Sequence, residues 1–306
     1  MPETKIAQAP PSQLKIWWLA ARPKTLWASV APVLMGSALA LGDGVFHGIT
    51  ALVTLLAAMA IQIGTNLAND YFDYIKGADT EDRLGPTRAT QAGWVTPAAM
   101  KRAFILAFAI AFFFGLYLIY RGGWPILAIG LASILFGILY TAGPAPLGYT
   151  GWADLFVLIF FGPVAVGGTY YVQALEWRLP ALIAGLGPGF LSVALLTINN
   201  LRDVETDARS GKKTLAVRFG KQFARMEFFL SFLIAAVIPV VLLLWYPHKV
   251  SVIVVSVFVL FKAFRLKSRV WTYANPVELN QVLEQTGKTI FVYSILFFLV
   301  WVTLPV

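Results

Sequence analysis

The chain of 306 residues contains no cysteine and only two histidines, and both shortages restrict its chemistry. Without cysteine it has no disulfide, no thiolate nucleophile and no cysteine-bound metal. His47 and His248 fall in short turns between apolar segments, which argues against a histidine metal cluster. Charged residues make up 13% of the chain, whereas 58% of its residues are hydrophobic and the mean hydropathy is +0.73. Soluble domains do not have such a composition.

Long apolar runs recur along the chain. A helix needs about 20 apolar residues to cross the hydrocarbon core of a bilayer. Nine segments approach that length, at residues 25–42, 49–69, 98–120, 124–141, 152–173, 180–201, 222–246, 249–266 and 286–305. The runs are continuous and do not alternate between apolar and polar residues, which favours helices over barrel strands. The sequence therefore predicts an all-α, polytopic membrane protein with about nine transmembrane helices.

We expect one domain over residues 1–306, because no linker or low-complexity segment divides the chain. Residues 1–24 would form an N-terminal tail and a segment at the membrane interface, where tryptophans interleave with basic residues. Residues 25–305 would form a single helical bundle with a central cavity open to the cytoplasmic side. The sequence carries no signal for the oligomeric state.

The net charge of +9 is unevenly distributed between the two expected sides of the membrane. If nine helices start from a cytoplasmic N-terminus, the outer turns hold Arg121, Arg178 and Lys249, and 21 of the 24 basic residues lie inside. Cytoplasmic loops of membrane proteins carry this excess. The charge therefore indicates topology and not a nucleic-acid partner. Since the polar N-terminus lacks the features of a secretory signal, we expect the bacterial cytoplasmic (inner) membrane, with the lipid bilayer as surroundings.

Two predicted spans end in similar clusters of asparagine and aspartate. The second span ends with Asn66, Asn69, Asp70 and Asp73, and the sixth ends with Asn199, Asp203 and Asp207. Spacings of three and four residues place each set on one helical face. The first asparagines, and likewise the first aspartates, are 133 residues apart. This suggests an internal repeat, with two related helix bundles that face each other.

Carboxylates gathered at one membrane face repel one another unless cations neutralise them. Carboxylate and amide oxygens suit Mg2+, which proteins commonly hold with one or two carboxylates and substrate phosphates. The expected metal ligands are Asp70, Asp73, Asp203, Asp207, Asn66 and Asn199. For one cluster alone, helix capping and solvated charge would be the better explanation. The matched pair favours two or more ions that bridge a diphosphate.

Basic loops follow both acidic clusters. The first contains Arg83 and Arg88 around a Gly-Pro turn, and the second contains Lys212, Lys213 and Arg218. Compact basic turns suit phosphate oxygens. Topology alone would also place basic residues there, so the two explanations stay open.

The motifs resemble those of the UbiA superfamily of intramembrane prenyltransferases, and within it the 1,4-dihydroxy-2-naphthoate polyprenyltransferases of menaquinone biosynthesis. The matching segments are Arg22-Pro-Lys-Thr25, Asn66-Leu-Ala-Asn-Asp70, Asp82-Arg-Leu-Gly-Pro-Thr-Arg88, Ile198-Asn-Asn-Leu-Arg-Asp203 and Gly211-Lys-Lys-Thr214. They are spread over most of the chain. The acidic motifs identify the superfamily, whereas the naphthoate branch depends on the looser segments.

The resemblance implies a Mg2+-dependent transferase that joins a polyprenyl diphosphate to an aromatic acid, with loss of CO2. The residues implied in catalysis are Asp70, Asp73, Asp203, Asp207, Tyr140 and Lys212. Those implied in substrate binding are Arg22, Lys24, Asn66, Asn69, Tyr71, Arg83, Arg88, Asn199, Lys213 and Arg218. Tyr140, with Tyr71 as the second candidate, would stabilise a cationic allylic carbon. Arg22 or Lys24 would hold the aromatic acid.

Two further features are expected near the site. Asp154 is an ionisable residue at the start of a predicted span, and it either takes part in function or caps that helix. Small residues would allow close helix packing in two spans, at Gly162, Gly167 and Gly168 in one and at Gly185, Gly187 and Gly189 in the other. Pro163 and Pro188 would add kinks beside a cavity.

Other functions are less consistent with the pattern. A transporter commonly carries inverted repeats and charges within its spans, but here the charges gather at helix ends on one side. A CDP-alcohol transferase continues Asp-x2-Asp with glycine, whereas Tyr74 follows Asp73. Soluble polyprenyl synthases share the metal chemistry without membrane spans. Among acceptors, 4-hydroxybenzoate and homogentisate remain alternatives, and the isoprenoid chain length is not encoded in a readable motif.

Overall fold

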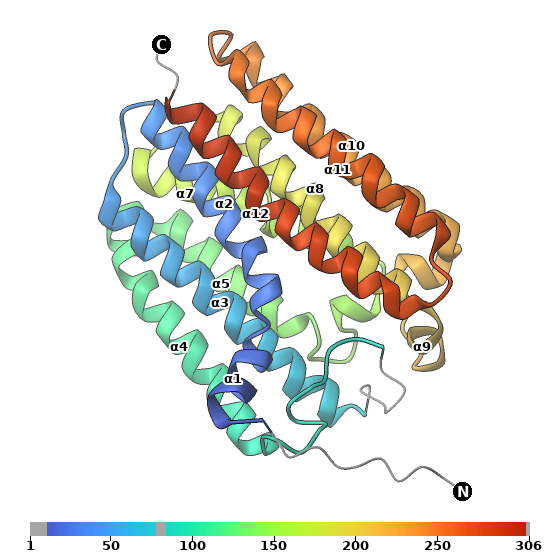
Figure 1. Ribbon diagram of the computed structural model, residues 1–306. Coiled ribbons are helices and arrows are strands. Elements are labelled where there is room, and N and C mark those ends of the chain that lie inside the picture. Colours follow the sequence, from blue (N-terminus) through green and yellow to red (C-terminus); the bar gives the residue numbers. More distant parts are fainter. Residues whose placement is uncertain (1–10, 78–83, 304–306) are drawn as a thin grey trace, which may run out of the picture.

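The computed structural model describes residues 11–77 and 84–303, and within these ranges every regular element is a helix (Figure 1). The α-helices are α1 Gln13–Ala21, α2 Pro23–Gly42, α3 Gly48–Ile75, α4 Pro97–Gly122, α5 Trp124–Leu139, α6 Ala153–Phe160, α7 Pro163–Ala174, α8 Leu179–Arg202, α9 Val204–Arg209, α10 Leu215–Val241, α11 Ile253–Thr272 and α12 Leu279–Thr303. The short 3-10 helices are η1 Leu147–Tyr149, η2 Leu242–Leu244, η3 Val250–Val252 and η4 Pro276–Glu278. The expected all-α architecture is confirmed.

Seven helical segments of the described chain are long and apolar enough to cross a membrane. They comprise α2, α3, α4, the α6–α7 pair, α8, α10 and α12. Helix α5 is shorter, and α11 carries four basic residues between Lys262 and Arg269. Both lie where spans were predicted, so the count of nine spans stays a prediction.

Several helices continue beyond the apolar runs that predicted them. Helix α3 extends past residue 69 to Ile75, and α12 begins at Leu279 instead of residue 286. Helix α11 is shifted toward the C-terminus, to Ile253–Thr272. Backbone hydrogen bonds continue a helix through polar residues as readily as through apolar ones. The last turns of α3 therefore hold the acidic cluster rigidly.

The helices pack around a central group. Figure 1 shows α3, α4 and α5 on one side and α8, α10, α11 and α12 on the other, with α2 and α7 between them. Helix α3 packs closely on α4, α10 on α8 and α11, and α12 on α2. This arrangement brings the ends of α3 and α8 to the same end of the bundle.

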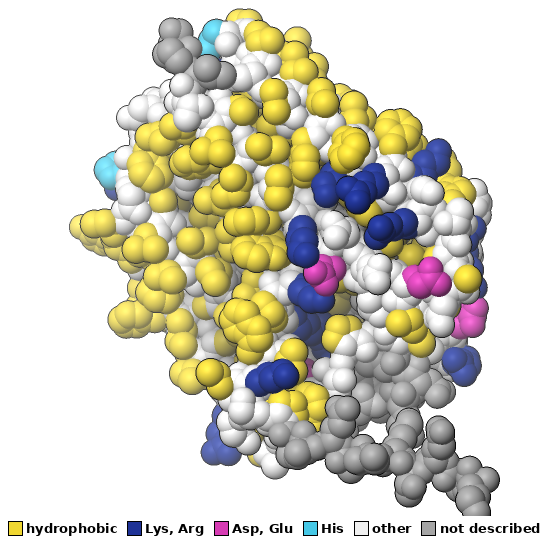
Figure 2. Space-filling model, in the orientation of Figure 1, with side chains coloured by type: hydrophobic (Ala, Val, Ile, Leu, Met, Phe, Trp, Pro, Cys, Tyr) yellow, Lys and Arg dark blue, Asp and Glu magenta, His cyan; other side chains and the backbone are white. Residues whose placement is uncertain are grey.

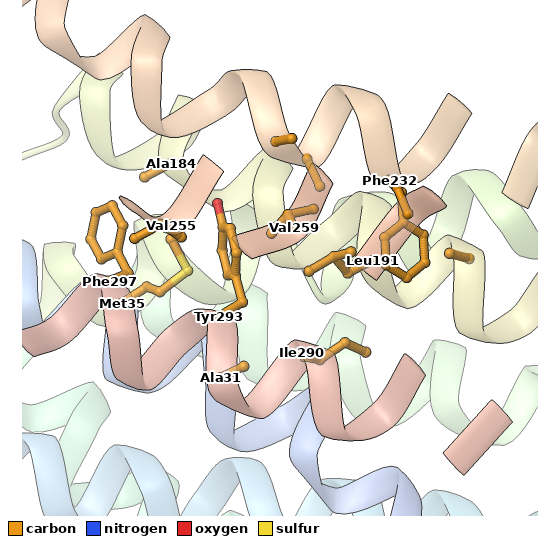
Figure 3. Packing of buried hydrophobic residues seen from close by; sticks show 14 of the residues in the cluster. Ala31, Met35, Ala184, Leu191, Phe232, Val255, Val259, Ile290, Tyr293 and Phe297 are labelled. Carbon is orange, nitrogen blue, oxygen red and sulfur yellow. The ribbon is translucent and has the colours of Figure 1, made fainter. Parts of the chain in front are cut away.

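The largest apolar core joins α2, α8, α10, α11 and α12 (Figure 3). Met35, Leu191, Phe232, Tyr293 and Phe297 are all fully buried in it. Burial of such side chains stabilises a helix pair by van der Waals packing even where the outer surface is apolar. This core fixes the rotation of α8 about its axis, and it therefore fixes the direction in which the polar residues at the end of α8 point.

Much of the outer surface is also apolar, as Figure 2 shows for one face. On α4, for example, Phe113 is 73% exposed and Leu106 is 61% exposed. Exposed apolar surface of this extent marks contact with a membrane. Basic side chains gather toward one end of the same face (Figure 2). The chain is an integral membrane protein.

The predicted fifth span is broken into α6 and α7. Gly162 has a non-helical conformation (φ −115°, ψ −113°), and Pro163, which lacks a backbone N–H, begins α7. Gly162 packs directly on the backbone of α8 at Gly185 and Gly189. The expected close packing at these glycines is observed, and the expected kink at Pro163 is a complete break.

We expect Gly185→Val to destabilise the protein strongly. A Cβ atom at residue 185 would lie 2.6 Å from the carbonyl carbon of Gly162 and 2.7 Å from the nitrogen of Pro163, so the two backbones would have to separate. Overpacking of this kind costs at least about 1–3 kcal/mol. Thermal unfolding in detergent measures the effect. Gly115→Val is the matched control, since a Cβ there meets nothing within 4 Å; an equal loss in both variants would contradict the account.

Candidate active site

A polar cavity of about 230 Å³ lies where the ends of α3 and α8 meet. The charged and polar residues that line it include Arg22, Asn66, Asn69, Asp73, Arg88, Tyr140, Tyr149, Asn199, Asn200, Asp203, Asp207 and Lys212. Most of the residues predicted for the site are therefore brought together. The two acidic clusters, far apart in the sequence, face one space.

Asp73 of α3 is 4% exposed and is held by two donors. The Arg88 guanidinium donates to its Oδ2 at 2.7 Å, and the Tyr149 hydroxyl donates to its Oδ1 at 3.0 Å. Arg88 is itself 6% exposed. A buried pair of opposite charges fixes the direction of both side chains. Asp73 is thus an oriented carboxylate at the wall of the cavity.

Asp70 does not line the cavity, although the sequence predicts it as a metal ligand. Its two carboxylate oxygens accept the backbone N–H groups of Ala89 and Thr90, at 3.0 and 3.2 Å. It is 2% exposed. Asp70 therefore anchors the loop that carries Arg88. A second anchor is Asn280 of α12, whose amide donates to the Leu84 carbonyl at 3.0 Å.

The second acidic cluster contains a buried arginine that the sequence analysis left without a role. Arg202 donates to both carboxylate oxygens of Asp203, at 2.8 and 2.6 Å. It also donates to the side-chain oxygens of Asn199 and Asn280, at 2.7 and 2.8 Å. Its position directly before Asp203 was the available signal. Arg202 fixes Asp203 in place and links α8 to α12.

Asp207 lies on α9, one turn beyond Asp203, and pairs with Lys212. The Lys212 ammonium is 2.9 Å from the Asp207 carboxylate. The backbone N–H of Lys212 also donates to the Asp207 carbonyl at 3.0 Å. The turn between them is thereby closed. Each aspartate of the cavity is consequently balanced by a basic side chain of the protein itself.

Tyr149 is a cavity residue that the sequence analysis missed. The Lys76 and Lys212 ammonium groups lie over its ring, 5.4 and 5.0 Å from the centroid. Its carbonyl accepts the Lys213 backbone N–H at 2.8 Å. Partial burial lowers the pKa of Lys76, and nearby Asp73 opposes that shift. The one available signal was the position of Tyr149 in a loop on the same side as the aspartates.

The predicted asparagines hold the walls of the cavity. Asn66 donates to the Ala21 carbonyl at 2.9 Å and to the Thr25 hydroxyl at 3.1 Å, which fixes the junction of α1 and α2. Asn69 accepts the Thr141 hydroxyl at 2.9 Å, which ties α3 to the end of α5. The junction carries Arg22, a non-glycine residue with positive φ (54°). The asparagines thus position other groups.

Tyr140 caps the C-terminus of α5 and lines the cavity, as predicted. Its carbonyl accepts the backbone N–H of Gly148 at 2.8 Å. A Cβ atom at Gly148 would lie 2.9 Å from the Tyr140 ring, so the absence of a side chain there lets the ring pack against the backbone. The ring is therefore rigidly placed.

Other predicted residues lie away from the cavity. Lys24 is exposed and pairs with Glu284 at 2.6 Å. Tyr71 packs on Phe72 and Phe104, with ring centroids 5.0 and 5.6 Å away. Exposed positions also hold two basic residues of the second loop, Lys213 and Arg218. Arg83 lies outside the described residues.

Asp154 is buried in the first turn of α6, at 6% exposure. Neither of its carboxylate oxygens has a hydrogen-bond partner among the residues that the structure describes. The N-cap residue of α6 is Trp152, which makes no side-chain cap. The structure thus gives no support to the capping interpretation, and a functional role for Asp154 stays a prediction.

An apolar groove of about 240 Å³ continues from the polar cavity into the bundle. The two spaces share the lining residues Ala28, Gln62, Thr65, Val157 and Phe161. Beyond these, the groove is lined mostly by apolar residues, with a few serines and threonines among them. An amphipathic ligand with an anionic head and a long apolar tail would match both parts.

Comparison with known proteins decides the family. Residues 29–302 match the UbiA prenyltransferase family. The chain belongs to that family. It is 37% identical to a 1,4-dihydroxy-2-naphthoate octaprenyltransferase of Haemophilus influenzae, over 93% of this chain and 95% of that protein. Proteins of the same name from Escherichia coli (42% identity, 70% of this chain, 71% of that protein) and Mycobacterium tuberculosis (38%, 91% and 94%) are also similar.

Solved UbiA structures share the fold. The chain resembles a UbiA homolog from Archaeoglobus fulgidus bound to GPP and Mg2+, with a TM-score of 0.66 at 15% identity, over 90% of this chain and 99% of that one. It also resembles the apo structure of a UbiA homolog from Aeropyrum pernix K1, with a TM-score of 0.67 at 15% identity, over 90% and 96% of the two chains. At this identity the likeness concerns the fold.

Proposed function

We propose that this UbiA-family enzyme transfers a polyprenyl group from an isoprenoid diphosphate to 1,4-dihydroxy-2-naphthoate, with release of diphosphate and CO2. The observation that carries the proposal is the joined cavity, in which aspartates at the ends of α3 and α8 and on α9 face a space that opens onto an apolar groove. The choice of naphthoate as acceptor is supported by two similar proteins named 1,4-dihydroxy-2-naphthoate octaprenyltransferase, which match nearly the whole chain. Other aromatic acids are the alternative acceptors.

The cavity suits Mg2+ by the chemistry of its donors. Among the described residues no three acidic or histidine side chains converge to hold an ion alone. Mg2+ seldom needs such a set, because one or two carboxylates with phosphate oxygens and water complete its octahedron. Asp73, Asp203 and Asp207 would hold it together with the substrate diphosphate. When bound, it would supply Lewis-acid polarisation of the leaving group.

The basic side chains of the cavity would take up the charge of the departing diphosphate. Arg88 and Lys212 are paired with Asp73 and Asp207, so each can exchange its carboxylate for phosphate oxygens when the carboxylate turns to a cation. Before substrate binds, these two pairs offset the cost of burying four charged groups in apolar surroundings. We therefore assign both groups to diphosphate binding.

The other residues of the cavity and the apolar groove would bind the carbon skeletons of the isoprenoid and of the aromatic acid. Tyr140, which lines the cavity, would offer its ring to the allylic carbon as positive charge develops there. Arg22 would bind the carboxylate of the aromatic acid, and not Lys24, which points outward to Glu284. The apolar groove would bury the isoprenoid tail and keep water from the cationic carbon.

We propose further that the cavity end faces the cytoplasm and that the membrane is the bacterial inner membrane. The support is the predicted excess of basic residues on that side. Accessibility labelling of Lys213, which is exposed at this end, would test the orientation in inside-out vesicles.

The proposed reaction is tested with purified protein, labelled geranylgeranyl diphosphate, Mg2+ and separate aromatic acids. We expect a prenylated naphthalene product and stoichiometric CO2 with 1,4-dihydroxy-2-naphthoate. A product with 4-hydroxybenzoate or homogentisate but none with naphthoate would reassign the acceptor. No product with any of the three would contradict the proposed function.

We expect Tyr149→Phe to raise the Mg2+ concentration for half-maximal activity by about tenfold, because groups that orient a metal-binding carboxylate contribute 10- to 100-fold to affinity. The hydroxyl that donates to Asp73 would be lost, while the ring beneath Lys76 and Lys212 would remain. Titration of activity with Mg2+ measures this. Tyr71→Phe removes a hydroxyl of α3 that lies outside the cavity and should leave this Mg2+ concentration unchanged; equal shifts in both variants would refute the role of Tyr149.

A further inference from the structure

A second group of basic side chains lies on the outer surface of α11 and α12, outside the cavity. Its members are Lys262 and Arg265 on α11 and Lys288 on α12. Lys262 is within electrostatic range of the other two, which carry the same charge. Figure 2 shows Lys and Arg side chains gathered on this face among hydrophobic ones. We call these three residues the outer basic cluster.

The outer basic cluster lies at the boundary between apolar and polar surface. On the preceding turns of α11, Val254, Val257 and Phe261 are 55%, 59% and 61% exposed. Arg265, one turn after Phe261, is exposed as well. Exposed apolar side chains contact acyl chains, whereas Lys and Arg extend to the headgroups. The cluster therefore lies at headgroup level, on the same side of the membrane as the aspartate cavity.

The charge of the outer basic cluster is only partly compensated. Glu284 is 2.8 Å from Lys288 and 2.6 Å from Lys24, so one carboxylate serves two ammonium groups. Along residues 11–77 and 84–303, no acidic side chain pairs with Lys262 or Arg265. Like charges held together in a medium of low polarity attract a multivalent or concentrated anion. At this depth the available anions are lipid phosphates.

We propose that the outer basic cluster binds the phosphate headgroup of an anionic phospholipid from the adjoining leaflet. The acyl chains of that lipid lie along the apolar stripe of α11 that ends at Phe261 and Phe264. Basic pockets between transmembrane helices bind anionic headgroups in this way. A zwitterionic lipid fits poorly, because its ammonium group would meet uncompensated positive charge. The proposal is independent of the reaction proposed above.

The test is native mass spectrometry of the full chain released from nanodiscs that contain equal amounts of phosphatidylglycerol and phosphatidylcholine. We expect the wild-type protein to retain phosphatidylglycerol preferentially. The double variant Lys262→Gln, Arg265→Gln should lose that preference by about tenfold or more, since each basic residue near the surface contributes about 1 kcal/mol. The matched control is Lys101→Gln with Arg102→Gln, an exposed basic pair at the start of α4.

Three results would overturn the proposal. One is equal retention of the two lipids by the wild-type protein, and another is an equal loss in the control variant. The third is displacement of phosphatidylglycerol by added geranylgeranyl diphosphate, which would make the cluster a substrate-docking surface. If the double variant fails to fold, the charge-preserving exchange Lys262→Arg, Arg265→Lys takes its place. It must retain phosphatidylglycerol as the wild-type protein does.

Discussion

Asp73→Asn and Asp203→Asn should each lower kcat/KM for prenyl transfer by at least about 100-fold, because each removes a carboxylate whose charge is needed when the diphosphate departs. Both residues line the cavity, one from α3 and the other from α8. The amide keeps the shape of the side chain but cannot neutralise a cation. Steady-state assays at saturating Mg2+ measure the loss, and additional Mg2+ should restore little of it.

Each of these substitutions also leaves a buried arginine without its carboxylate. Arg88 and Arg202 would lose their charged partners, so stability must be measured beside activity. Glu205→Gln is the matched control, since Glu205 lies two residues from Asp203 but its side chain is 71% exposed and paired with Lys221. A folded variant of Asp73 or Asp203 with normal activity would remove the aspartates from the mechanism.

Gly130→Phe should shorten the isoprenoid that the enzyme accepts. Gly130 of α5 lines the apolar groove, and a Cβ atom there meets nothing within 4 Å, so a large ring would project into open space. Ten residues separate it from Tyr140, or about 15 Å along the helix. We expect transfer from octaprenyl diphosphate to fall between about 10- and 100-fold, as overfilling an apolar site costs roughly 1–3 kcal/mol.

The readout that separates a blocked groove from a damaged enzyme is the short substrate. Geranyl diphosphate should react with Gly130→Phe at nearly the wild-type rate, because its tail ends before the new ring. Competition between the two substrates in one assay gives the ratio directly. Parallel losses for both would show that the tail does not follow this groove.

The sequence predicted the membrane bundle and the meeting of the two acidic ends, because both follow from short-range patterns. Apolar runs long enough to cross a bilayer are visible without any partner helix. The repeated spacing of Asn66 with Asp70 and of Asn199 with Asp203 is likewise local. What these patterns lack is the rotation of each helix about its axis, which is fixed by packing.

That missing rotation bears on Asp70, whose role as a metal ligand stays a prediction. Asp70 and Asp73 differ by about 60° around the helix, so both appear on one face in a sequence diagram. In the structure Asp73 faces the cavity and Asp70 faces the loop of Ala89 and Thr90. The loop reaches this place through Asn280 of α12, a contact across 196 residues that no local pattern reveals.

The neutralising charges were predicted in part. Gathered carboxylates need cations, but their presence in the sequence does not show which cations neutralise them. Arg88, Arg202 and Lys212 supply them within the protein. The Asp73–Arg88 and Asp207–Lys212 pairs depend on the turns that follow α3 and α9, whereas Arg202 and Asp203 are neighbours in the sequence. The break at Gly162 was likewise predicted only in part, as a kink, because its extent depends on the backbone of α8 lying against that residue.

The central claim is that aspartates from α3 and α8 jointly hold a magnesium diphosphate in one cavity. Its most direct test is the binding of a non-reacting thiolodiphosphate analogue of geranylgeranyl diphosphate, measured by isothermal titration calorimetry with Mg2+ or with EDTA. We predict binding that requires Mg2+ and that is lost in both Asp73→Asn and Asp203→Asn. Equally tight binding in EDTA, or in either variant, would contradict the claim.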